Sequence, residues 1–546
     1  MALKVGLFLD GPVQPRWVHR VVESVNRSPA AEISLVVFNG AAPTAPRALS
    51  DRFKQSRRHL LYSVYSRVDS HRYGTSEDPL SLADLTHLIE DVPVLDVEPR
   101  QTKWSDFFSE GDVTRIAELR LHLILRHGFR ILRGDILEAA EYGIWSFHHG
   151  DNRTYRGGPP GYWEMSRGDT VTGTILQRIA DDLDNGHVLY RSWARTDQHS
   201  LRRGQNAYYA KSAEFVVRVI ERLDREGPDS IMSESEPFSP FSEPLCVMPS
   251  NWHTTLFLLR LTGRSFLNEF RRRLTREQWE IWFSLEDTTR PSLRKFTRMK
   301  PPLDRFWADP NIAVRGNRTW LFMEEFIYSE KRGHISACEI HTDGSWGEIL
   351  PALERPYHLS YPQVFEWEGA WWMIPETAEN RTVELYKCRR WPDDWELHSS
   401  LLHDVTAVDA TIQEIDGRWQ MWVNISVESA SSNDELHLYQ AVSPLGPWEP
   451  HRANPVVSDV RRARPAGPVF FSNGVWVRPS QDCSLRYGGA TVLNRIDEIS
   501  TTAYRETTIG RIEPHWEKQL LGTHTVNRGG GVTVVDAVRR RWKLGR

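Results

Sequence analysis

A turn containing glycine, followed by alternating aromatic and aliphatic residues, recurs at regular intervals through the second half of this chain. Such a strand buries one face of a small sheet, which then needs neighbouring sheets to cover it. A period of roughly fifty residues leaves room for about five units, and this predicts an all-β five-bladed propeller over residues 275–546. A β-sandwich with accidental regularity is the alternative. The segments are GNRTWLFMEE (316–325), EGAWWMIPE (368–376), DGRWQMWVN (416–424) and NGVWVRPSQ (473–481).

The first half of the chain alternates between two periodicities. Apolar runs typical of buried strands are separated by stretches with helical spacing, which predicts an α/β, Rossmann-like domain with a doubly wound, mainly parallel sheet. Ligands of such sheets gather at the carboxyl ends of strands, where SFHHGD (146–151) falls. We expect strands at 4–10, 31–40, 92–99, 129–132 and 143–150, and helices at 15–26, at 112–128 and within 199–225.

Between the two halves lies a stretch crowded with Pro and Ser, EGPDSIMSESEPFSPFSEPLCVMPSN (226–251). Such a composition is typical of a linker or an extended crossing segment. Most of the 22 tryptophans follow residue 275. We therefore expect a domain over 1–225, a linker with connecting helices over 226–274, and the propeller over 275–546.

Charge and cysteine usage exclude several classes of function. The 68 basic and 72 acidic side chains give a net charge of -4, which favours neither a nucleic-acid nor a membrane partner. Apolar runs such as LHLILRHGF (121–129) are too short to span a bilayer. MALKVGLFLDG (1–11) reads as a first strand and turn rather than a signal peptide. The four cysteines are scattered, which fits the reducing cytoplasm and argues against a disulfide framework or a structural zinc.

Residues 128–190 carry an ordered set of short motifs. FRIL (129–132) and SFH (146–148) are followed by YRGG (155–158), TGT (172–174) and DNG (184–186). In this order they resemble the catalytic region of the folate-dependent formyltransferases, whose pattern is a pterin-binding segment, Asn-x-His, an Arg-Gly loop, Thr-Gly-x-Thr and Asp-x-Gly. The separation of His148 and Asp184 is also the one that the family uses.

The resemblance implies 10-formyltetrahydrofolate as cofactor and a catalytic pair of His148 and Asp184. A histidine titrates near neutrality and can move the protons of an attacking amine, while a carboxylate holds the imidazole and stabilises its charged form. The remaining implied site residues are Arg130, Ile131, Leu132 and again Asp184 for the folate, with His149 and Arg156 facing the acceptor amine.

Ser146 is a departure from this family, because it stands where the family has asparagine. A hydroxyl donates one hydrogen bond but reaches less far than an amide toward a developing oxyanion. A bridging water, another donor such as His149 or a backbone N–H group, or altered chemistry could each account for it. A metal site at His148, His149 and Asp151 is disfavoured, because adjacent strand residues point to opposite faces. The prolines of DGPVQP (10–15) disfavour a phosphoribosyl acceptor, because they remove N–H donors.

The second half resembles known propellers as well. FWADPNIAV (306–314) is similar to the first blade of five-bladed propellers in glycoside hydrolases and sugar-binding proteins. YPQVFEWEGAWWMIPET (361–377), VDATI (408–412) and RPSQDCSLRYGG (478–489) resemble the propeller-like domain of plant glucosamine inositolphosphorylceramide transferases. The resemblance suggests Asp309, Glu376 and Asp409 as substrate-binding residues at the propeller centre. They could equally be structural carboxylates of turns and strand ends.

Together these observations predict an N-formyltransferase that moves a formyl group from 10-formyltetrahydrofolate to a small-molecule amine, either an amino sugar or a specialised metabolite. Two alternatives stay open. One is a catalytically degenerate formyltransferase fold that binds carbohydrate or serves as a scaffold. The other is a propeller glycoside hydrolase, in which paired carboxylates flank the glycosidic bond.

Overall fold

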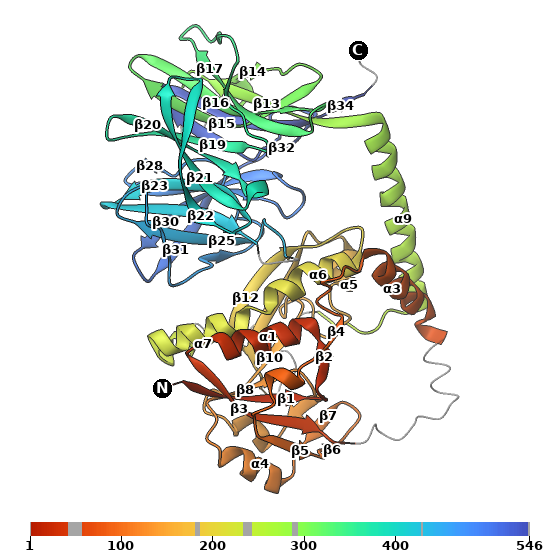
Figure 1. The fold of residues 1–546 in the computed structure, drawn as a ribbon. Helices are drawn as coiled ribbons and strands as arrows, with labels where there is room; N and C mark the ends of the chain where they lie inside the picture. Colours follow the sequence, from red (N-terminus) through yellow and green to blue (C-terminus); the bar gives the residue numbers. More distant parts are fainter. Residues whose placement is uncertain are drawn as a thin grey trace. The chain divides into compact units, whose positions relative to one another are not determined.

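The computed structural model describes residues 2–41, 57–180, 186–232, 243–286, 293–426 and 430–543. The chain forms two compact units (Figure 1). The first is built from Met1–Ser265 and the second from Phe266 onward, apart from Glu428–Ala430. The boundary falls within one helix, α9 (Asn251–Leu274), so a continuous helix occupies the second half of the expected linker. Among the described residues, no helix combines the length and the apolar composition needed to cross a membrane.

A seven-stranded sheet forms the centre of the first unit, in the order β12-β11-β10-β8-β1-β3-β5. Its first five strands along the chain pair in parallel, and the last two form an antiparallel edge. The predicted mainly parallel α/β sheet is therefore confirmed. The strands are β1 (Leu3–Leu9), β3 (Ala31–Asn39), β5 (Val94–Val97), β8 (Leu123–Arg126), β10 (Ile144–His148), β11 (Val171–Arg178) and β12 (His187–Arg195).

Helices pack on both faces of this sheet. On one face Val21 and Val219, of helices α1 (Arg16–Arg27) and α7 (Phe215–Glu226), join the strand residues Leu7 and Leu125 in one buried cluster. On the other face Phe8 and Ile124 pack with Ile116 of α4. Alternate residues of β1 and β8 thus belong to the two cores in turn. This explains why both strands are nearly continuous apolar runs, as is typical of buried parallel strands.

The prediction of a helix over 112–128 is wrong in its second half. Helix α4 (Glu110–Ala117) starts on the Ser109 side-chain cap and ends early, and β8 occupies the apolar run LILR. A short apolar run fits a fully buried strand as well as a helix, and here burial between two layers decides for the strand. The FRIL strand is confirmed as β9 (Ile131–Arg133).

Smaller elements complete the first unit. The predicted helical stretch 199–225 is divided into α6 (Leu201–Ser212) and α7. The other described elements are β2 (Val13–Pro15), α3 (Leu60–Tyr73), β4 (Leu82–Asp84), η1 (Thr86–Leu88), β6 (Arg100–Gln101), β7 (Ser105–Phe107), η2 (Asp135–Glu138), α5 (Tyr162–Arg167) and α8 (Asp229–Met232).

The described part of the second unit consists of five antiparallel sheets of four or five strands each. The first combines β13 (Thr275–Ser284) and β14 (Thr297–Met299) with the C-terminal strands β32 (Leu520–Gly522), β33 (Val526–Gly529) and β34 (Val532–Trp542). The second sheet consists of β15 (Arg305–Arg315), β16 (Arg318–Ile327), β17 (Arg332–Ile340) and β18 (Leu350–Leu353), and the third of β19 (Ser360–Trp367), β20 (Ala370–Thr377), β21 (Thr382–Arg390) and β22 (Asp394–His403). The fourth consists of β23 (Ala407–Ile415), β24 (Arg418–Ile425), β25 (Glu435–Ala441), β26 (Glu449–Pro450) and β27 (Val457–Ser458). The fifth consists of β28 (Phe470–Ser472), β29 (Val475–Asp482), β30 (Ala490–Ile499) and β31 (Tyr504–Ile512). Two short helices, η3 (Leu293–Lys295) and η4 (Ala378–Asn380), lie between strands.

The glycine turns recognised in the sequence join the first two strands of four of these sheets. Gly316, Gly369, Gly417 and Gly474 all have positive φ, between 63° and 80°, a conformation that hairpin turns require and glycine adopts without strain. A fifth turn of the same kind, at Gly530, joins β33 to β34. Strand β13 pairs with β34 from Thr275–Trp542 to Ser284–Thr533, so both ends of the unit share one sheet.

The first strands of consecutive sheets are tied to one another by side-chain hydrogen bonds. Val364 N–H donates to Asn311 Oδ1 (3.1 Å), and Ile412 N–H donates to Gln363 Oε1 (2.6 Å). Each of β15, β19 and β23 has an irregularity in its pairing just before these residues. The bulged residues Asp309, Tyr361 and Asp409 have φ of 51°, 45° and 54°. Bulges re-aim side chains, and left-handed non-glycine residues of this kind concentrate at functional sites.

Candidate active site and a second polar centre

The first unit contains a pocket of about 220 Å³ at the carboxyl end of β10. Four of the predicted motifs contribute to its lining, and they come from distant parts of the sequence. They are Ile131 and Leu132 of FRIL, Ser146 and His148 of SFH, Gly157 of YRGG and Gly186 of DNG. Asp184, the predicted partner of His148, lies outside the described residues.

Three polar side chains form a row across the floor of this pocket. The register aligns Arg126 of β8 with Ser146 of β10, and Ser146 with Gln177 of β11. Aligned residues of neighbouring strands project from the same face, and all three line the pocket. Arg126 Nη1 donates to Ser146 Oγ (2.9 Å), and its Nη2 donates to the carbonyls of Phe129 (3.2 Å) and Arg130 (2.9 Å). The guanidinium is thereby fixed in one plane beside Ser146.

Gln177 brings an unusual polar group to this row. The residue is 3% exposed, and within the described ranges its amide oxygen is buried without a hydrogen-bond partner. Leaving such a group unpaired costs roughly 1–3 kcal/mol. A buried, pocket-lining amide without a partner therefore points to a ligand or water that supplies a donor.

His148 is held by the loop that follows it. Its Nε2 lies 2.6 Å from the carbonyl oxygen of Tyr155. A carbonyl only accepts hydrogen bonds, so Nε2 is the ring nitrogen that carries a proton. His148 is 8% exposed and projects from the same face of β10 as Ser146, two residues away.

The structure places His149 away from this pocket. Its ring stacks on Tyr209 with centroids 3.8 Å apart, and its Nε2 lies 3.1 Å from Ser212 Oγ. Burial, aided by the neighbouring His148 and His127, holds the pKa of His149 well below its ordinary value. A neutral imidazole in an aromatic core fits neither a substrate contact nor a metal shared with His148.

The side chains of Arg130 and Arg156 also turn away from the pocket. Arg130 donates to Gln101 Oε1 (3.1 Å) and to the carbonyl of Thr102, so its part in the pocket is its backbone carbonyl, which holds Arg126. Arg156 Nη2 donates to the carbonyl of Glu243 (3.4 Å). Of the residues expected to bind folate, Ile131 and Leu132 line the pocket.

Two motif glycines allow close backbone contacts around the site. Gly157 has φ of 84°, and a Cβ there would lie 2.3 Å from the carbonyl oxygen of Cys246. The segment around Cys246 thus pairs with the YRGG loop through backbone hydrogen bonds on both sides of Gly157. Gly173 of TGT packs against Asp151, 3.0 Å from where a Cβ would stand. Asp151 accepts from Arg191 (3.0 Å) and, within its own turn, from the N–H group of Arg153 (3.1 Å).

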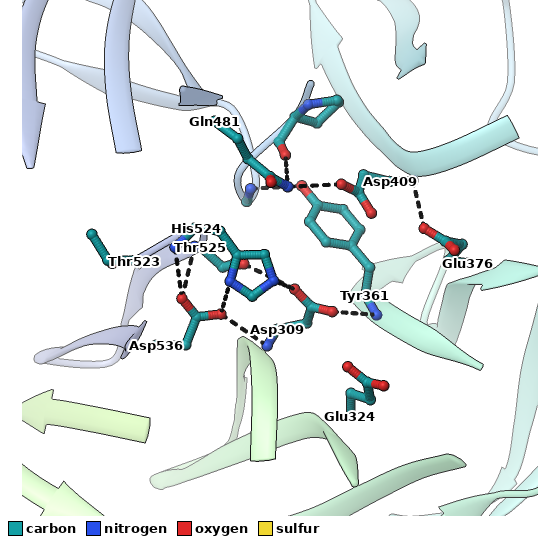
Figure 2. A network of polar contacts seen from close by, with 12 residues as sticks. Asp309, Glu324, Tyr361, Glu376, Asp409, Gln481, Thr523, His524, Thr525 and Asp536 are labelled. Atoms are coloured by element: carbon teal, nitrogen blue, oxygen red, sulfur yellow. Dashed lines mark hydrogen bonds and ion pairs between the residues drawn. The ribbon is translucent and has the colours of Figure 1, made fainter. Parts of the chain in front are cut away.

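A second polar centre occupies the second unit, where Asp309, His524 and Asp536 form a buried ion triad (Figure 2). His524 Nε2 lies 3.1 Å from Asp309 Oδ1, and its Nδ1 lies 2.7 Å from Asp536 Oδ2. Burial lowers the pKa of His524, but the two carboxylates outweigh it and raise that pKa to about 10. The imidazole is therefore protonated and bridges two carboxylates.

Three ligand atoms of the triad lie within 4.8 Å of one another, a spacing that a metal site would also have. A metal requires a neutral imidazole nitrogen, whereas here both nitrogens face carboxylates in a protonated ring. Backbone N–H groups also occupy a carboxylate oxygen of the triad, because those of His524 and Thr525 donate to Asp536 Oδ1 (2.9 and 3.0 Å). The arrangement fits an internal ion triad better than a cation.

Both carboxylate oxygens of Asp409 also accept hydrogen bonds from other residues of the protein. Arg464 donates to both of its carboxylate oxygens (2.6 and 3.2 Å), and Gln481 Nε2 donates to Oδ2 (2.8 Å). Asp409 N–H in turn donates to Glu376 Oε2 (3.3 Å). Asp409 therefore links β23 to Glu376 of β20 and to Gln481 of β29, and both of its carboxylate oxygens are already used. The Asp309 oxygens likewise accept from Tyr361 N–H (3.3 Å) and Thr525 Oγ1 (3.0 Å).

Two glutamates, Glu324 and Glu376, also lie at this centre (Figure 2). Glu376 Oε2 is ion-paired with Arg464 Nη2 at 3.6 Å. Burial, aided by the negative charge of Asp309, raises the pKa of Glu324 well above its ordinary value. Burial and Asp409 do the same for Glu376, with Arg464 opposing them. Glu324 lies 3.5 Å from the Nε2 of His358, which is half-exposed. The half-exposed ring of Tyr487 packs against the Arg464 guanidinium, 4.8 Å from its centroid. A raised pKa favours the protonated carboxyl, which can both donate to and accept from hydroxyl groups.

Sequence reasoning missed several of these residues. The sequence contained a signal that could have identified Arg126 as a functional residue, because a charged residue ends an otherwise apolar strand at the carboxyl edge of the sheet. Gln177 had none, since a single polar residue in TILQR is unremarkable in sequence. His524, Asp536 and Arg464 lie far from the motifs with which they pair.

Comparison with known proteins gives a class to each half of the chain. The N-terminal half is similar to methionyl-tRNA formyltransferases, and the C-terminal half carries a region that is similar to glucosamine inositolphosphorylceramide transferases. Residues 297–523 match the family described as Glucosamine inositolphosphorylceramide transferase 1, N-terminal.

Two curated relatives and one solved structure illustrate these similarities. Glucosamine inositolphosphorylceramide transferase 1 of Oryza sativa subsp. japonica is 33% identical over 208 residues, 37% of this chain and 28% of that protein. Methionyl-tRNA formyltransferase of Deinococcus radiodurans is 37% identical over 106 residues, 18% of this chain and 31% of that protein. In both cases this chain spans less than a third of the relative's own length. A family 117 glycoside hydrolase of Zobellia galactanivorans has a TM-score of 0.32 and 10% identity, covering 49% of this chain and 91% of the other.

Proposed function

We propose that the protein is an N-formyltransferase that transfers a formyl group from 10-formyltetrahydrofolate to the amine of an amino sugar or a related metabolite. One observation carries the proposal: residues of FRIL, SFH, YRGG and DNG, separated in the sequence, line a single pocket with His148. The sequence match to methionyl-tRNA formyltransferases supports the class of reaction.

The pocket fits the head of a folate. A volume of about 220 Å³ suits a bicyclic ring with its formyl group rather than a whole folate, so the tail of the cofactor would extend outside. Ile131 and Leu132 offer apolar side chains to the faces of the ring. The buried amide oxygen of Gln177 lacks a donor among the described residues, and the N–H groups of a pterin are such donors. The bound folate supplies the formyl carbon.

The residues of this chain then manage the protons. The lone pair of the acceptor amine forms a bond to the formyl carbon, and the amine becomes an ammonium that must lose a proton. His148 Nδ1 accepts that proton, while Nε2 stays bonded to the Tyr155 carbonyl. By the resemblance to the formyltransferases, Asp184 is proposed as the carboxylate that favours the imidazolium. The proton passes to the leaving nitrogen of the folate, which departs as tetrahydrofolate.

The second unit is proposed to be a five-bladed propeller that recognises the acceptor. The pairing of β13 with β34 would close its ring. Glu324 and Glu376 offer hydrogen-bonding groups, and Tyr487, packed on Arg464, offers an aromatic face of the kind that polar ligands use. An amino sugar is supported by the name of the rice relative, in which glucosamine is the transferred group. We expect the protein in the cytoplasm, with no nucleic-acid or membrane partner.

The test is formyl transfer by the full chain, followed as release of tetrahydrofolate with a panel of amino sugars. Calorimetry with a stable formyl-folate analogue measures cofactor binding separately. We expect micromolar binding and turnover with at least one amine. Binding without turnover on any amine would favour the degenerate, carbohydrate-binding alternative, and absence of folate binding would refute the proposal. Glu376→Gln should raise the KM of the acceptor and leave folate binding unchanged.

A further inference from the structure

The first unit must stabilise negative charge without the asparagine amide that formyltransferases of this pattern carry. In acyl transfer the carbonyl oxygen becomes an oxyanion, and a preorganised donor aimed at that oxygen is commonly the largest contribution to the rate. Ser146 occupies the position of that amide. His149, one of the donors considered from the sequence, lies in the aromatic core instead.

The neighbouring strand supplies a group that fills this position. Arg126 lies in register with Ser146, and its Nη1 donates to Ser146 Oγ (2.9 Å). A short side chain at 146 leaves room for the guanidinium, whereas an asparagine would extend into the space that Arg126 uses. Three hydrogen bonds, to Ser146 and to two backbone carbonyls, fix the plane of the guanidinium before any ligand binds.

We propose that Arg126 is a catalytic residue that stabilises the oxyanion of formyl transfer, with Ser146 as its positioning residue. This inference rests on the proposed function. When the amine attacks, the electron pair of the formyl C=O moves to oxygen, and the cation of Arg126 offsets the charge. The pair returns as the carbon–nitrogen bond to the folate breaks. A guanidinium is always charged and presents donors in a rigid fork, so it suits this task as well as an amide.

The position of Arg126 among the pocket residues agrees with this role. Arg126, Ser146 and His148 line the same pocket from one face of the sheet. The oxyanion donor and the proton acceptor would thus reach one reacting carbon from adjacent strands. Gln177, on the other side of Ser146 in the row, is the rival donor, because its amide also faces the pocket.

Kinetics of the full chain test this proposal. Arg126→Ala should lower kcat about 10²–10³-fold, the usual effect of removing an oxyanion donor, with KM changed less than about threefold. Arg126→Ala combined with Ser146→Asn should recover at least tenfold of that loss, because the asparagine then has room to supply the family's amide. Ser146→Asn alone should slow the reaction, since it displaces Arg126. The matched control is Arg178→Ala, an arginine of β11 that does not line the pocket and pairs with Glu138 at 3.7 Å.

A spectroscopic measurement separates this role from a structural one. The ¹³C-labelled formyl carbonyl of 10-formyl-5,8-dideazafolate should absorb at lower frequency when bound to the wild type than in water. Arg126→Ala should abolish that shift while the Kd of the analogue stays within about threefold. Two results would overturn the role of Arg126 without touching the proposed function. One is an unchanged kcat and carbonyl frequency in Arg126→Ala, and the other is a loss of kcat that is larger in Gln177→Ala than in Arg126→Ala. A wild type that transfers formyl to no amine would overturn the proposed function itself.

Discussion

The ion triad of the second unit makes a quantitative prediction about stability. Asp536 is fully buried, and four groups face its oxygens: the N–H groups of His524 (2.9 Å), Thr525 (3.0 Å) and Asp309 (3.1 Å), and His524 Nδ1 (2.7 Å). In Asp536→Asn only one oxygen remains. The new amide then presents its own N–H groups to the donors that Oδ2 had served.

Removing one partner of a buried ion pair costs roughly 3–5 kcal/mol, because the other charge is left uncompensated. For a unit of this size each kcal/mol lowers Tm by about 2–4 °C, so Asp536→Asn should lower one melting transition by roughly 6–20 °C. The exposed pair of Asp304 and Arg305 (3.0 Å) provides the control. Asp304→Asn should cost less than about 1 kcal/mol, as expected of surface ion pairs. Scanning calorimetry of the full chain measures both.

The pH dependence gives a second check on the triad. His524 has a pKa of about 10 in the folded protein and 6.5 as its ordinary value. The folded state therefore keeps a proton that the unfolded chain releases, so the contribution of His524 to stability is complete below pH 6.5 and is lost as pH rises toward 10. The Tm difference between wild type and Asp536→Asn should shrink over this range. A shift below about 2 °C at pH 6.5, where roughly 6–20 °C is expected, would refute the reasoning.

Three further predictions concern single positions. His148→Ala should lower the rate of formyl transfer by about 10²–10⁴-fold while the Kd of a formyl-folate analogue changes little; a rate within fivefold of wild type would contradict the proton-transfer role. Gly157→Ala should lower Tm more than Gly168→Ala, because both glycines have positive φ (84° and 86°) but only the first would place a Cβ against another atom, 2.3 Å from the Cys246 carbonyl oxygen; equal shifts would mean that backbone strain alone matters. Glu324→Gln should raise Tm at pH 8 more than at pH 5, because the raised pKa of Glu324 makes its ionisation unfavourable in the folded state; equal or opposite shifts would exclude a buried, protonated carboxyl.

Much of the fold was predictable because it depends on local pattern. Alternation of aromatic and aliphatic residues after a glycine turn is a property of a few neighbouring residues, and each of the four turns recognised in this way joins two strands. The α/β pattern of the first half was equally local. It failed within 112–128, where an apolar run can be a helix or a buried strand and only the layers on both sides decide.

The features of the candidate site also divide into those that were predictable from the sequence and those that were not. The resemblance to the formyltransferases, carried by the order of motifs along 128–190, implied that His148 and Ser146 share a pocket with Ile131 and Leu132. The period-2 geometry of a strand also separates His148 from His149, and the structure agrees. These inferences needed only the sequence, because each concerns residues on one strand or motifs in a fixed order.

Only the tertiary structure aligned Arg126 with Ser146 and Gln177, and only it joined Asp309 to His524 and Asp536. Strand register is set by how whole layers pack, and no local pattern encodes which residue of β8 lies beside which residue of β10. The triad joins residues more than two hundred positions apart, and its protonated histidine exists because burial brings two carboxylates to one imidazole. Charge and burial at a site are properties of the folded arrangement, whereas the sequence determines which side chains are available to it.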